Sequence, residues 1–495
     1  MSMEKQSLKD IINFRLQKLE KLRESGIDPY PHNFKPLHNS KEVKKEFENF
    51  ENKDVVLAGR IMTIRKMGKA SFFHIEDANG RLQIYIKKDE VGESQYDQFK
   101  LLDIGDFIGV DGYVFKTKTE EISVHAKSIT ILAKSIRPLP IVKEKDGEIF
   151  DSFDNKEHRY RNRHLDLIVN PEVKEVFKKR SIITSALRSY LDNEGFLEVE
   201  TPVLQPLYGG ANARPFKTHH NTLDQTFYLR IADELYLKRL IIGGFDKVYE
   251  LSKDFRNEGM DRNHNPEFTM LEWYEAYSDY KDQMNRVEHI IRFAAKSIDK
   301  LKLDWGDIKI DLSKKFDRRP YLELLRDATG QDLLDADVKK LRLICKQNKI
   351  EISKNENYGK LLDELMRKLV EPNLTQPIFV TDHPREISPL AKSHRTGDEK
   401  IVERFELFIG GAEFANSFSE LNDPLDQRIR LENQAKLREE GDDEAQPIDD
   451  NFIEAMEYGM PPTGGVGLGV DRLIMLLTDN TSIRDVLLFP AMRNN

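Results

Sequence analysis

The chain concentrates chemically useful side chains in three separated segments. Residues 254–274 combine arginine, histidine, phenylalanine and glutamate, residues 404–420 are rich in glutamate, and residues 464–472 alternate glycines before an Asp-Arg pair. Guanidinium groups on rigid elements suit phosphates, because they are planar, permanently charged and able to donate two parallel hydrogen bonds. The aromatic rings, bare backbone and spare carboxylates beside them indicate a site for a nucleoside triphosphate and a small, positively charged molecule.

The first segment has the alternation of a long β-hairpin over residues 247–274. Alternation places Arg256 and Glu258 on one face of the outgoing strand. On the return strand one face carries, in order, Phe268, Met270, Glu272 and Tyr274. A solvent-facing strand rarely mixes aromatic rings with carboxylates, and the connecting residues 259–265 are rich in groups that can contact phosphate. We therefore predict that this face lines a binding site.

The glycine-rich segment fits neither a dinucleotide fingerprint nor a phosphate loop. Its spacing is Gly-x-Gly-x-Gly, and Pro461-Pro462 stand directly before it instead of a β-run. Glycines two residues apart predict a strand with one face kept bare for a ligand. Asp471-Arg472 then begins an apolar helix.

Residues 404–420 predict a second hairpin, with a tight turn at Gly410-Gly411. A two-residue turn sets Phe408 opposite Glu413, which makes Glu406 and Glu413 diagonal neighbours and natural ligands for Mg²⁺. Regular alternation would place three later residues on the opposite face of the strand, namely Asn416, Phe418 and Glu420. A bulge or a three-residue turn is needed if all are to line one pocket, and the sequence leaves this open.

The composition describes a highly charged globular protein, with 39% hydrophobic and 33% charged residues. The net charge of −9 argues against a protein that coats DNA generically. No apolar run approaches the ~18 residues of a membrane span, and the first residues show no signal-peptide core. Cys345 is the only cysteine, which excludes an internal disulfide or a thiolate metal cluster. We expect a cytoplasmic protein with no membrane association.

The expected fold class is α+β. An amphipathic helix over residues 7–25 precedes about five short strand patterns between Val55 and Ile136, which predict a closed barrel of the oligonucleotide-binding (OB) type. A larger unit with an antiparallel sheet flanked by helices follows. The expected divisions are 1–145 for the helix and barrel, 146–165 for a linker, and 166–495 for the catalytic domain with a helical insertion at about 280–375.

Three ordered motifs carry a family resemblance. They are Gly195 to Pro202, then Arg256-x-Glu258 with His264 and Phe268, then Gly465-x-Gly-x-Gly-x-Asp-Arg472. In this order behind a barrel they resemble motifs 1, 2 and 3 of the class II aminoacyl-tRNA synthetases. The similarity covers essentially the whole chain and is closest to the bacterial lysyl-tRNA synthetases. It also includes residues 159–167, 208–211, 230–240 and 488–493.

The resemblance implies roles for individual residues. Arg256 and Arg472 are the implied catalytic residues, with Arg256 on the α-phosphate and the lysine carboxylate. ATP would be bound by Arg256, Glu258, His264, Asn265, Phe268, Glu406, Glu413 and Arg472. Lysine would be bound by Gly210, Glu234, Arg256, Glu272, Tyr274, Asn416, Phe418, Glu420 and Gly467. Glu406 and Glu413 would hold Mg²⁺, and more than one ion is expected.

The same resemblance implies a two-step reaction. Lysine and ATP would form lysyl-adenylate with release of pyrophosphate, and the lysyl group would pass to the 3′-terminal adenosine of tRNA(Lys) for translation. This chemistry depends on positioning and charge stabilisation and needs no Ser/His/Asp triad. A homodimer is implied by motif 1, whose proline here is Pro202.

The barrel is implied to read the anticodon. Single-stranded bases are recognised by aromatic stacking and hydrogen bonds to base edges. Residues of these types on the barrel are Arg65, Phe72, Gln83 and Glu121. Alternation leaves only one of Phe72 and Phe73 for this role, and we favour Phe72 as the outward side chain.

The residue types agree independently with lysine as substrate. A buried ammonium must be paired, and Glu234, Glu272 and Glu420 offer acceptors in excess. The nearest alternative is an aspartyl- or asparaginyl-tRNA synthetase, which shares the domain order, but an aspartate-specific relative would need cationic residues at the end of that pocket. A ligase that lysylates a protein, such as elongation factor P ligase, would lack the barrel. A catalytically inactive tRNA-binding scaffold would need neither the arginines nor the carboxylates.

Overall fold

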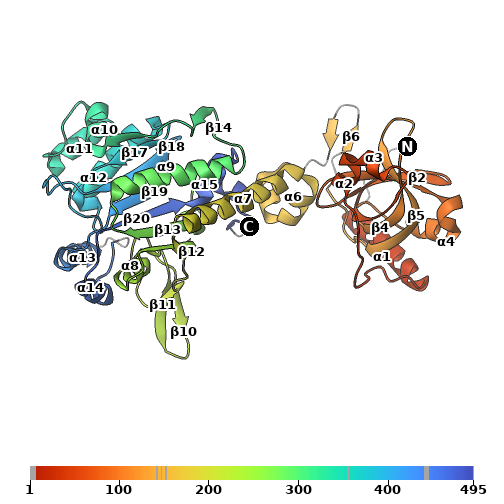
Figure 1. Ribbon diagram of the computed structural model, residues 1–495, viewed down its shortest axis with the longest axis horizontal. Coiled ribbons are helices and arrows are strands. Elements are labelled where there is room, and N and C mark those ends of the chain that lie inside the picture. The colour runs from red at the N-terminus through yellow and green to blue at the C-terminus, as the bar shows by residue number, and fades with distance from the viewer. Residues whose placement is uncertain are drawn as a thin grey trace. The chain divides into compact units, whose positions relative to one another are not determined.

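The computed structural model describes residues 7–140, 143–145, 148–150, 153–353, 356–439 and 445–493. The chain divides into two compact units, Met1–Asp154 and Asn155–Asn495 (Figure 1). The division lies inside the expected linker, but α5 (Lys156–Arg161) and α6 (Arg163–Val169) already fold with the second unit. Among the described residues, no helix combines the length and the apolar character that crossing a membrane requires.

The first unit is a closed five-stranded barrel, as the sequence predicts. Its strands follow the order β1-β2-β3-β5-β4. They are β1 (Asp54–Met67), β2 (Ala70–Glu76), β3 (Arg81–Lys87), β4 (Phe107–Lys116) and β5 (Ile122–Ala133). The helices of this unit are α1 (Leu8–Glu24), α2 (Ser40–Lys45), α3 (Phe47–Phe50) and α4 (Lys88–Lys100). Alternation on β2 buries Phe73 completely and leaves Phe72 half-buried on the outside, which confirms the predicted orientation of this pair.

Lys134 is a buried ion-pair centre of the barrel unit. Its ammonium is fully buried between Asp103 and Asp106, at 2.5 Å and 2.8 Å from their carboxylate oxygens. This lysine joins the end of β5 to the turn before β4 and lies in the first unit.

The second unit is built on an eight-stranded sheet with the order β16-β17-β18-β19-β20-β13-β12-β8. The strands are β8 (Leu197–Glu198), β12 (Lys247–Phe255), β13 (Glu267–Ala276), β16 (Asp317–Pro320), β17 (Ile378–Thr381), β18 (Arg404–Ile409), β19 (Ala412–Ser419) and β20 (Thr463–Gly469). Neighbours are antiparallel except for the parallel pairs at the two edges. The predicted antiparallel sheet and both predicted hairpins are confirmed.

The two faces of this sheet differ in chemistry. Leu271, Trp273 and Leu407 enter one large apolar core with α7 (Pro171–Asn193), α9 (Tyr280–Lys296) and α15 (Val470–Leu477). Figure 1 shows α7 and α9 lying beside one another along the sheet. On the face of Tyr274 the sheet contacts α8 (Glu234–Ile242) in a much smaller apolar cluster, which leaves room for a polar site. α13 (Pro424–Glu439) and α14 (Asp450–Glu457) pack against α8.

The segment expected as one helical insertion is divided. α9 belongs to the main core, and β16 is an edge strand of the main sheet. Between them lies a hairpin of β14 (Lys302–Trp305) and β15 (Ile308–Asp311). Only the residues after β16 form a helical body with its own apolar core. Its elements are α10 (Tyr321–Thr329), α11 (Val338–Gln347), α12 (Tyr358–Leu365), η1 (Met366–Val370) and η2 (Glu371–Asn373).

The remaining elements are short. They are β6 (Lys143–Lys145), β7 (Glu148–Phe150), β9 (Leu204–Gln205), β10 (Lys217–His220), β11 (Gln225–Leu229), η3 (Arg385–Ile387) and α16 (Ile483–Val486).

Asp471 joins α15 to two other elements, α7 and β13. Its Oδ1 accepts a hydrogen bond from Arg180 Nη1 of α7 at 2.6 Å. Its Oδ2 accepts from the backbone N–H of Thr269 in β13 at 2.7 Å. This aspartate in the first turn of α15 therefore holds β13 and α7 in place behind the binding face.

We predict that Asp471→Asn lowers the free energy of unfolding of the second unit by roughly 2–3 kcal/mol, because it removes a charged acceptor from a largely buried arginine. The two tryptophans, Trp273 and Trp305, both lie in this unit, so urea unfolding followed by their fluorescence measures it. Asp327→Asn removes an exposed partner of Arg319 and should leave the unfolding free energy close to wild type. Equal effects of both substitutions would contradict the role of Asp471.

Candidate active site

A cavity of about 570 Å³ lies on the polar face of the sheet in the second unit. Every residue that the sequence analysis assigned to ATP, lysine or metal lines it. These residues are Gly210, Glu234, Arg256, Glu258, His264, Asn265, Phe268, Glu272, Tyr274, Glu406, Glu413, Asn416, Phe418, Glu420, Gly467 and Arg472. Segments more than two hundred residues apart in sequence thus form one site, although the individual roles stay predictions.

Strand alternation explains the contribution of β13. Phe268, Glu272 and Tyr274 face the cavity, while Leu271 and Trp273 are fully buried on the opposite side. One detail of the hairpin prediction is wrong. β12 ends at Phe255, so Arg256 and Glu258 lie in the connecting loop and not on the strand. The backbone of Arg256 is still fixed next to the end of the hairpin, because its N–H donates to Pro266 O at 2.9 Å.

A β-bulge settles the question left open for β18 and β19. Phe408 pairs with Glu413 as predicted, but Leu407 pairs with Ala415, so Phe414 is the extra residue. The bulge restores Asn416 to the face that carries Glu413. The cavity is therefore lined by Glu413, Asn416 and Phe418 of β19 and by Glu420, the residue after this strand.

The glycine-rich segment forms β20, between β13 and β19. A Cβ atom at Gly465 would lie 2.2 Å from Glu420 Oε1 and 2.3 Å from Tyr274 Cε1. A Cβ atom at Gly467 would have only ordinary contacts, 3.8 Å or more from Met270 and Glu272. Gly465 thus makes room for the acidic side chains, and Gly467 keeps backbone open to the cavity.

One end of the cavity is strongly anionic. Glu420 is only 1% exposed, and burial raises its pKa to about 8. Within the described part of the chain, its Oε1 has no hydrogen-bond partner. Burial also raises the pKa values of Glu234 and Tyr274. A carboxylate oxygen in this setting favours a cationic ligand, because burial of an unpaired charge is costly.

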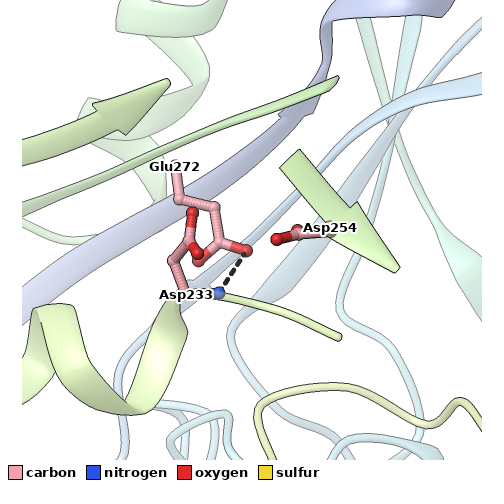
Figure 2. A group of neighbouring side chains, drawn as sticks. All are labelled: Asp233, Asp254 and Glu272. Carbon is pink, nitrogen blue, oxygen red and sulfur yellow. Dashed lines mark hydrogen bonds between the residues drawn. The ribbon is translucent and has the colours of Figure 1, made fainter. Parts of the chain in front are cut away.

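A second carboxylate group lies beside this end. Figure 2 shows Asp233, Asp254 and Glu272 pointing toward one another, with oxygens within 4.8 Å. Glu272 Oε1 accepts from the backbone N–H of Asp233 at 3.4 Å. Burial, together with Asp233 and Asp254, raises the pKa of Glu272. Of the three, only Glu272 lines the cavity.

Arg230 compensates part of this charge from behind. Its guanidinium lies 3.0 Å from Asp233, 2.7 Å from Glu250 and 3.4 Å from Asp254. One arginine cannot pair with all of these carboxylates, and burial raises the pKa values of Asp233, Asp254 and Glu272 despite its charge.

The other end of the cavity is cationic and aromatic. Arg256 lies over the Phe268 ring at 5.1 Å, and its buried Nε has no hydrogen-bond partner among the described residues. Arg472 Nη1 donates to Glu413 O at 2.6 Å, and its Nη2 lies 3.3 Å from His264 Nε2. These donors and the ring match the predicted phosphate and base contacts.

Loop residues hold His264 in position. Asp261 accepts from the backbone N–H of His264 at 2.8 Å and contacts its Nδ1 at 2.9 Å. Asn265 lies beside it, but its side chain bonds Glu267 O and the N–H of Ala491. The carboxamide of Asn265 is thus engaged in holding the loop.

Glu406 and Glu413 lie in a carboxylate-rich corner. Burial and the neighbouring Glu406 raise the pKa of Glu413. Burial, then Glu406 and Glu413, raises the pKa of Glu371 to about 7, and burial with Glu406 raises that of Asp363 to about 6. Carboxylates that raise one another's pKa values favour a divalent cation.

The sequence analysis missed several positioning residues. Arg404 donates to Asn416 Oδ1 at 3.1 Å and to Glu406 Oε1 at 2.5 Å, a role that alternation along β18 could have suggested. The roles of Arg230, Asp261 and Asp363 have no comparable sequence signal. They depend on contacts between distant segments or on the conformation of a loop.

The barrel brings its predicted residues together on one surface. Arg65 pairs with Phe72 across β1 and β2. Gln83 donates to Glu121 at 3.1 Å, and Glu121 also contacts His74 at 3.2 Å. The Phe72 ring lies 4.8 Å from the ring of Tyr85, which the sequence analysis did not single out.

Comparison with known proteins agrees with this geometry. Residues 155–493 match the family described as "tRNA synthetases class II (D, K and N)", and residues 55–132 match the "OB-fold nucleic acid binding domain". The chain belongs to the class II tRNA synthetases.

Similar proteins span the whole chain. A protein of Porphyromonas gingivalis (strain ATCC 33277) named "Lysine--tRNA ligase" is 51% identical over 490 residues, which cover 97% of this chain and 85% of that protein. One of Staphylococcus epidermidis (strain ATCC 35984) with the same name is 49% identical over 500 residues and 99% of each chain. The similarity therefore includes both units of this synthetase.

We predict that Gly465→Ala disrupts the anionic end of the cavity, because its Cβ would overlap Glu420 and Tyr274. Overpacking of this kind costs roughly 1–3 kcal/mol of unfolding free energy. Gly469→Ala on the same strand is the control, since its Cβ would have no contact closer than 3.7 Å. Urea unfolding and amino-acid-dependent ATP–pyrophosphate exchange measure both variants. Wild-type stability and exchange in Gly465→Ala would contradict the close approach.

Proposed function

We propose that this chain is a lysine–tRNA ligase that forms lysyl-adenylate from lysine and ATP and transfers the lysyl group to tRNA(Lys). The observation that carries the proposal is the buried, unpartnered Oε1 of Glu420 at the anionic end of a cavity whose other end is cationic. An amino acid with a charged ammonium at the end of its side chain complements this polarity. The names of the relatives agree with it.

The lysine end is formed by carboxylates and neutral partners. Glu234 and Glu420 accept from the amino groups of lysine, while Glu272, Tyr274 and Asn416 complete the polar wall. Phe418 supplies apolar contact for the methylenes, and Gly210 and Gly467 let the backbone approach the amino acid. Support comes from the shared lining of the cavity and the raised pKa values of Glu420 and Glu272.

Arg256 is positioned for the first chemical step. Its free Nε and its place in the cavity suit a contact with both the lysine carboxylate and the α-phosphate. The carboxylate would then attack the α-phosphorus in line, and pyrophosphate would leave. Arg256 lowers the repulsion between these two anions and stabilises the charge that develops, so it acts through electrostatics and alignment.

His264 and Arg472 are assigned to the outer phosphates, with Glu258 and Asn265 beside them. Asp261 fixes the ring of His264, so its Nε2 stays directed toward Arg472. Adenine is assigned to the space between Phe268 and the guanidinium of Arg472, where stacking and cation–π attraction favour a flat ring.

The corner of Glu406 and Glu413 fits Mg²⁺. Two carboxylates on adjacent strands, with the carboxylates of Asp363 and Glu371 near them, form the oxygen-rich setting that this ion prefers. A bound ion there would neutralise and orient the phosphates. Arg404 bonds Glu406 and keeps its carboxylate in place.

In the second step a ribose hydroxyl of the terminal adenosine of tRNA attacks the mixed anhydride, and AMP leaves. The barrel would select the tRNA by its anticodon through Arg65, Phe72, Gln83 and Glu121. Phe72 offers an outward ring, and Gln83 and Glu121 are hydrogen-bonded to each other at 3.1 Å, so both are held for base-edge recognition.

A homodimer that acts in the cytoplasm is part of this proposal. Large apolar side chains are exposed around motif 1 and its neighbours, namely Ile182, Leu197, Val203, Leu204 and Leu223. An apolar surface of this kind favours contact with a second copy of the chain. Sedimentation velocity of the full chain measures the assembly.

ATP–pyrophosphate exchange tests the proposed reaction directly. The wild-type protein should catalyse exchange with lysine and not with aspartate or asparagine, because neither of those side chains brings a cation to the carboxylates. Exchange that depends on aspartate or asparagine would show that one of these amino acids, and not lysine, is the substrate.

We predict that Glu420→Gln raises the KM for lysine by roughly 30-fold or more, because truncating the charge of a buried pair costs about 2–5 kcal/mol. The KM for ATP should change less than about twofold, since Glu420 lies at the opposite end from Arg472. Glu275→Gln is the matched control on β13, where Glu275 pairs with Arg286 and does not line the cavity. Equal weakening for lysine and ATP would refute the assignment.

We predict that Phe72→Ala raises the KM for tRNA(Lys) roughly 5- to 100-fold, since stacking of a base on an aromatic ring contributes about 1–3 kcal/mol. Lysine-dependent exchange should be unchanged. Phe107→Ala is the control, because this exposed ring lies opposite Arg60, five positions along β1 from Arg65. A loss of exchange in Phe72→Ala, or equal losses of charging in both variants, would contradict a role in anticodon stacking.

A further inference from the structure

A buried lysine lies directly behind the anionic end of the cavity. Lys238 is on α8, one helical turn after Glu234, and its side chain is fully buried. Its Nζ lies 2.6 Å from Glu234 Oε1 and also pairs with Glu420 Oε2. Lys238 does not itself line the cavity, whereas both of its partners do.

The ammonium of Lys238 pairs with only some of the oxygens of the two carboxylates. It takes one oxygen of Glu234 and one of Glu420. The other oxygen of Glu420, Oε1, has no hydrogen-bond partner among the described residues and faces Gly465. Lys238 therefore fixes the orientation of this carboxylate, whose free oxygen lies against Gly465, another residue that lines the cavity.

The charge of the group follows from these pairs. Two carboxylates and one ammonium leave a net charge of −1, which one ammonium of a ligand balances. Nearby cations are committed elsewhere: Arg404 to Glu406 and Asn416, and Arg230 to Asp233, Glu250 and Asp254. The other titratable groups that face the pair, Glu272 and Tyr274 on β13, add no positive charge.

We propose that Lys238 is a positioning and specificity-determining residue of the lysine pocket, which favours the ionised forms of Glu234 and Glu420 and leaves the ionised pair one positive charge short. This inference rests on the proposed lysine specificity and deepens it. Without Lys238 a proton would take its place on the carboxylates. A ligand ammonium would then have to displace that proton, and this would hold up to a higher pH than in the wild-type protein.

The electrostatics of the group support this role. Burial alone would lower the pKa of Lys238, but Glu234 and Glu420 raise it above its ordinary value, so the side chain is charged. Burial raises the pKa of Glu420 to about 8 although Lys238 acts to lower it. Removal of Lys238 would therefore raise this pKa further. Lysine binding needs the ionised pair, so the affinity for lysine would rise with pH. In the variant this rise would occur at higher pH than in the wild-type protein.

The test is the dissociation constant of lysine for each variant relative to wild type at the same pH, measured by calorimetry on the full-length protein at several values from about pH 6 to about pH 9.5, below the ~10.4 pKa of the lysine side chain. Lys238→Met keeps the length and removes the charge. Lys238→Gln keeps a donor for one carboxylate and carries the same measurement if the methionine variant does not fold. Lys134→Met is the matched control, because Lys134 is an equally buried lysine between two carboxylates in the first unit.

At pH 7 both Lys238 variants should bind lysine roughly tenfold or more weakly, with the pH dependence displaced upward. ATP binding and the lysine affinity of Lys134→Met should stay near wild type. Wild-type affinity at every pH would overturn the inference, and so would a loss of equal size at every pH. Failure of the wild-type protein to bind lysine would instead contradict the proposed function.

Discussion

Negative charge buried at one end of the ligand cavity is the constraint on which the second unit depends. Glu234, Glu272 and Glu420 are nearly inaccessible to water, where an unpaired carboxylate costs several kcal/mol. Two buried cations, Lys238 and Arg230, offset part of the charge from behind the wall. In the proposed function, a cationic ligand balances what remains. The anionic wall therefore links folding of this region to the choice of substrate.

The sheet makes this arrangement possible because its two faces have separate tasks. One face packs its aliphatic and aromatic side chains against α7, α9 and α15, and this core supplies the stability. The other face can then carry charged side chains and glycines, which contribute little to the stability of the core. Asp471 shows how the two are joined, since it lies in the first turn of α15 and also holds β13 and α7.

Local pattern was sufficient to predict the elements and much of the site. Period-two alternation placed Phe268, Glu272 and Tyr274 on one face, and the Gly-x-Gly-x-Gly spacing predicted the bare strand β20. The pattern could not decide the register after Gly410-Gly411, because the bulge at Phe414 arises from packing across strands. It also placed Arg256 on a strand that ends one residue earlier.

Long-range ion pairs explain most of what the sequence did not reveal. Lys238 is spaced like any i, i+4 partner of Glu234, and only the fold brings Glu420 to the same ammonium. Arg230 and Asp254 likewise meet through the pairing of separate segments. Such residues bear no motif of their own, because their role depends on which distant carboxylate they face.

Calorimetric titration of the wild-type protein with lysine, and separately with aspartate, tests the central claim most directly. The account predicts that lysine binds without ATP, because the anionic end of the cavity is already formed, and that aspartate does not bind. Binding of aspartate with no binding of lysine would contradict the account, because it would mean that the carboxylates do not serve a cationic side chain.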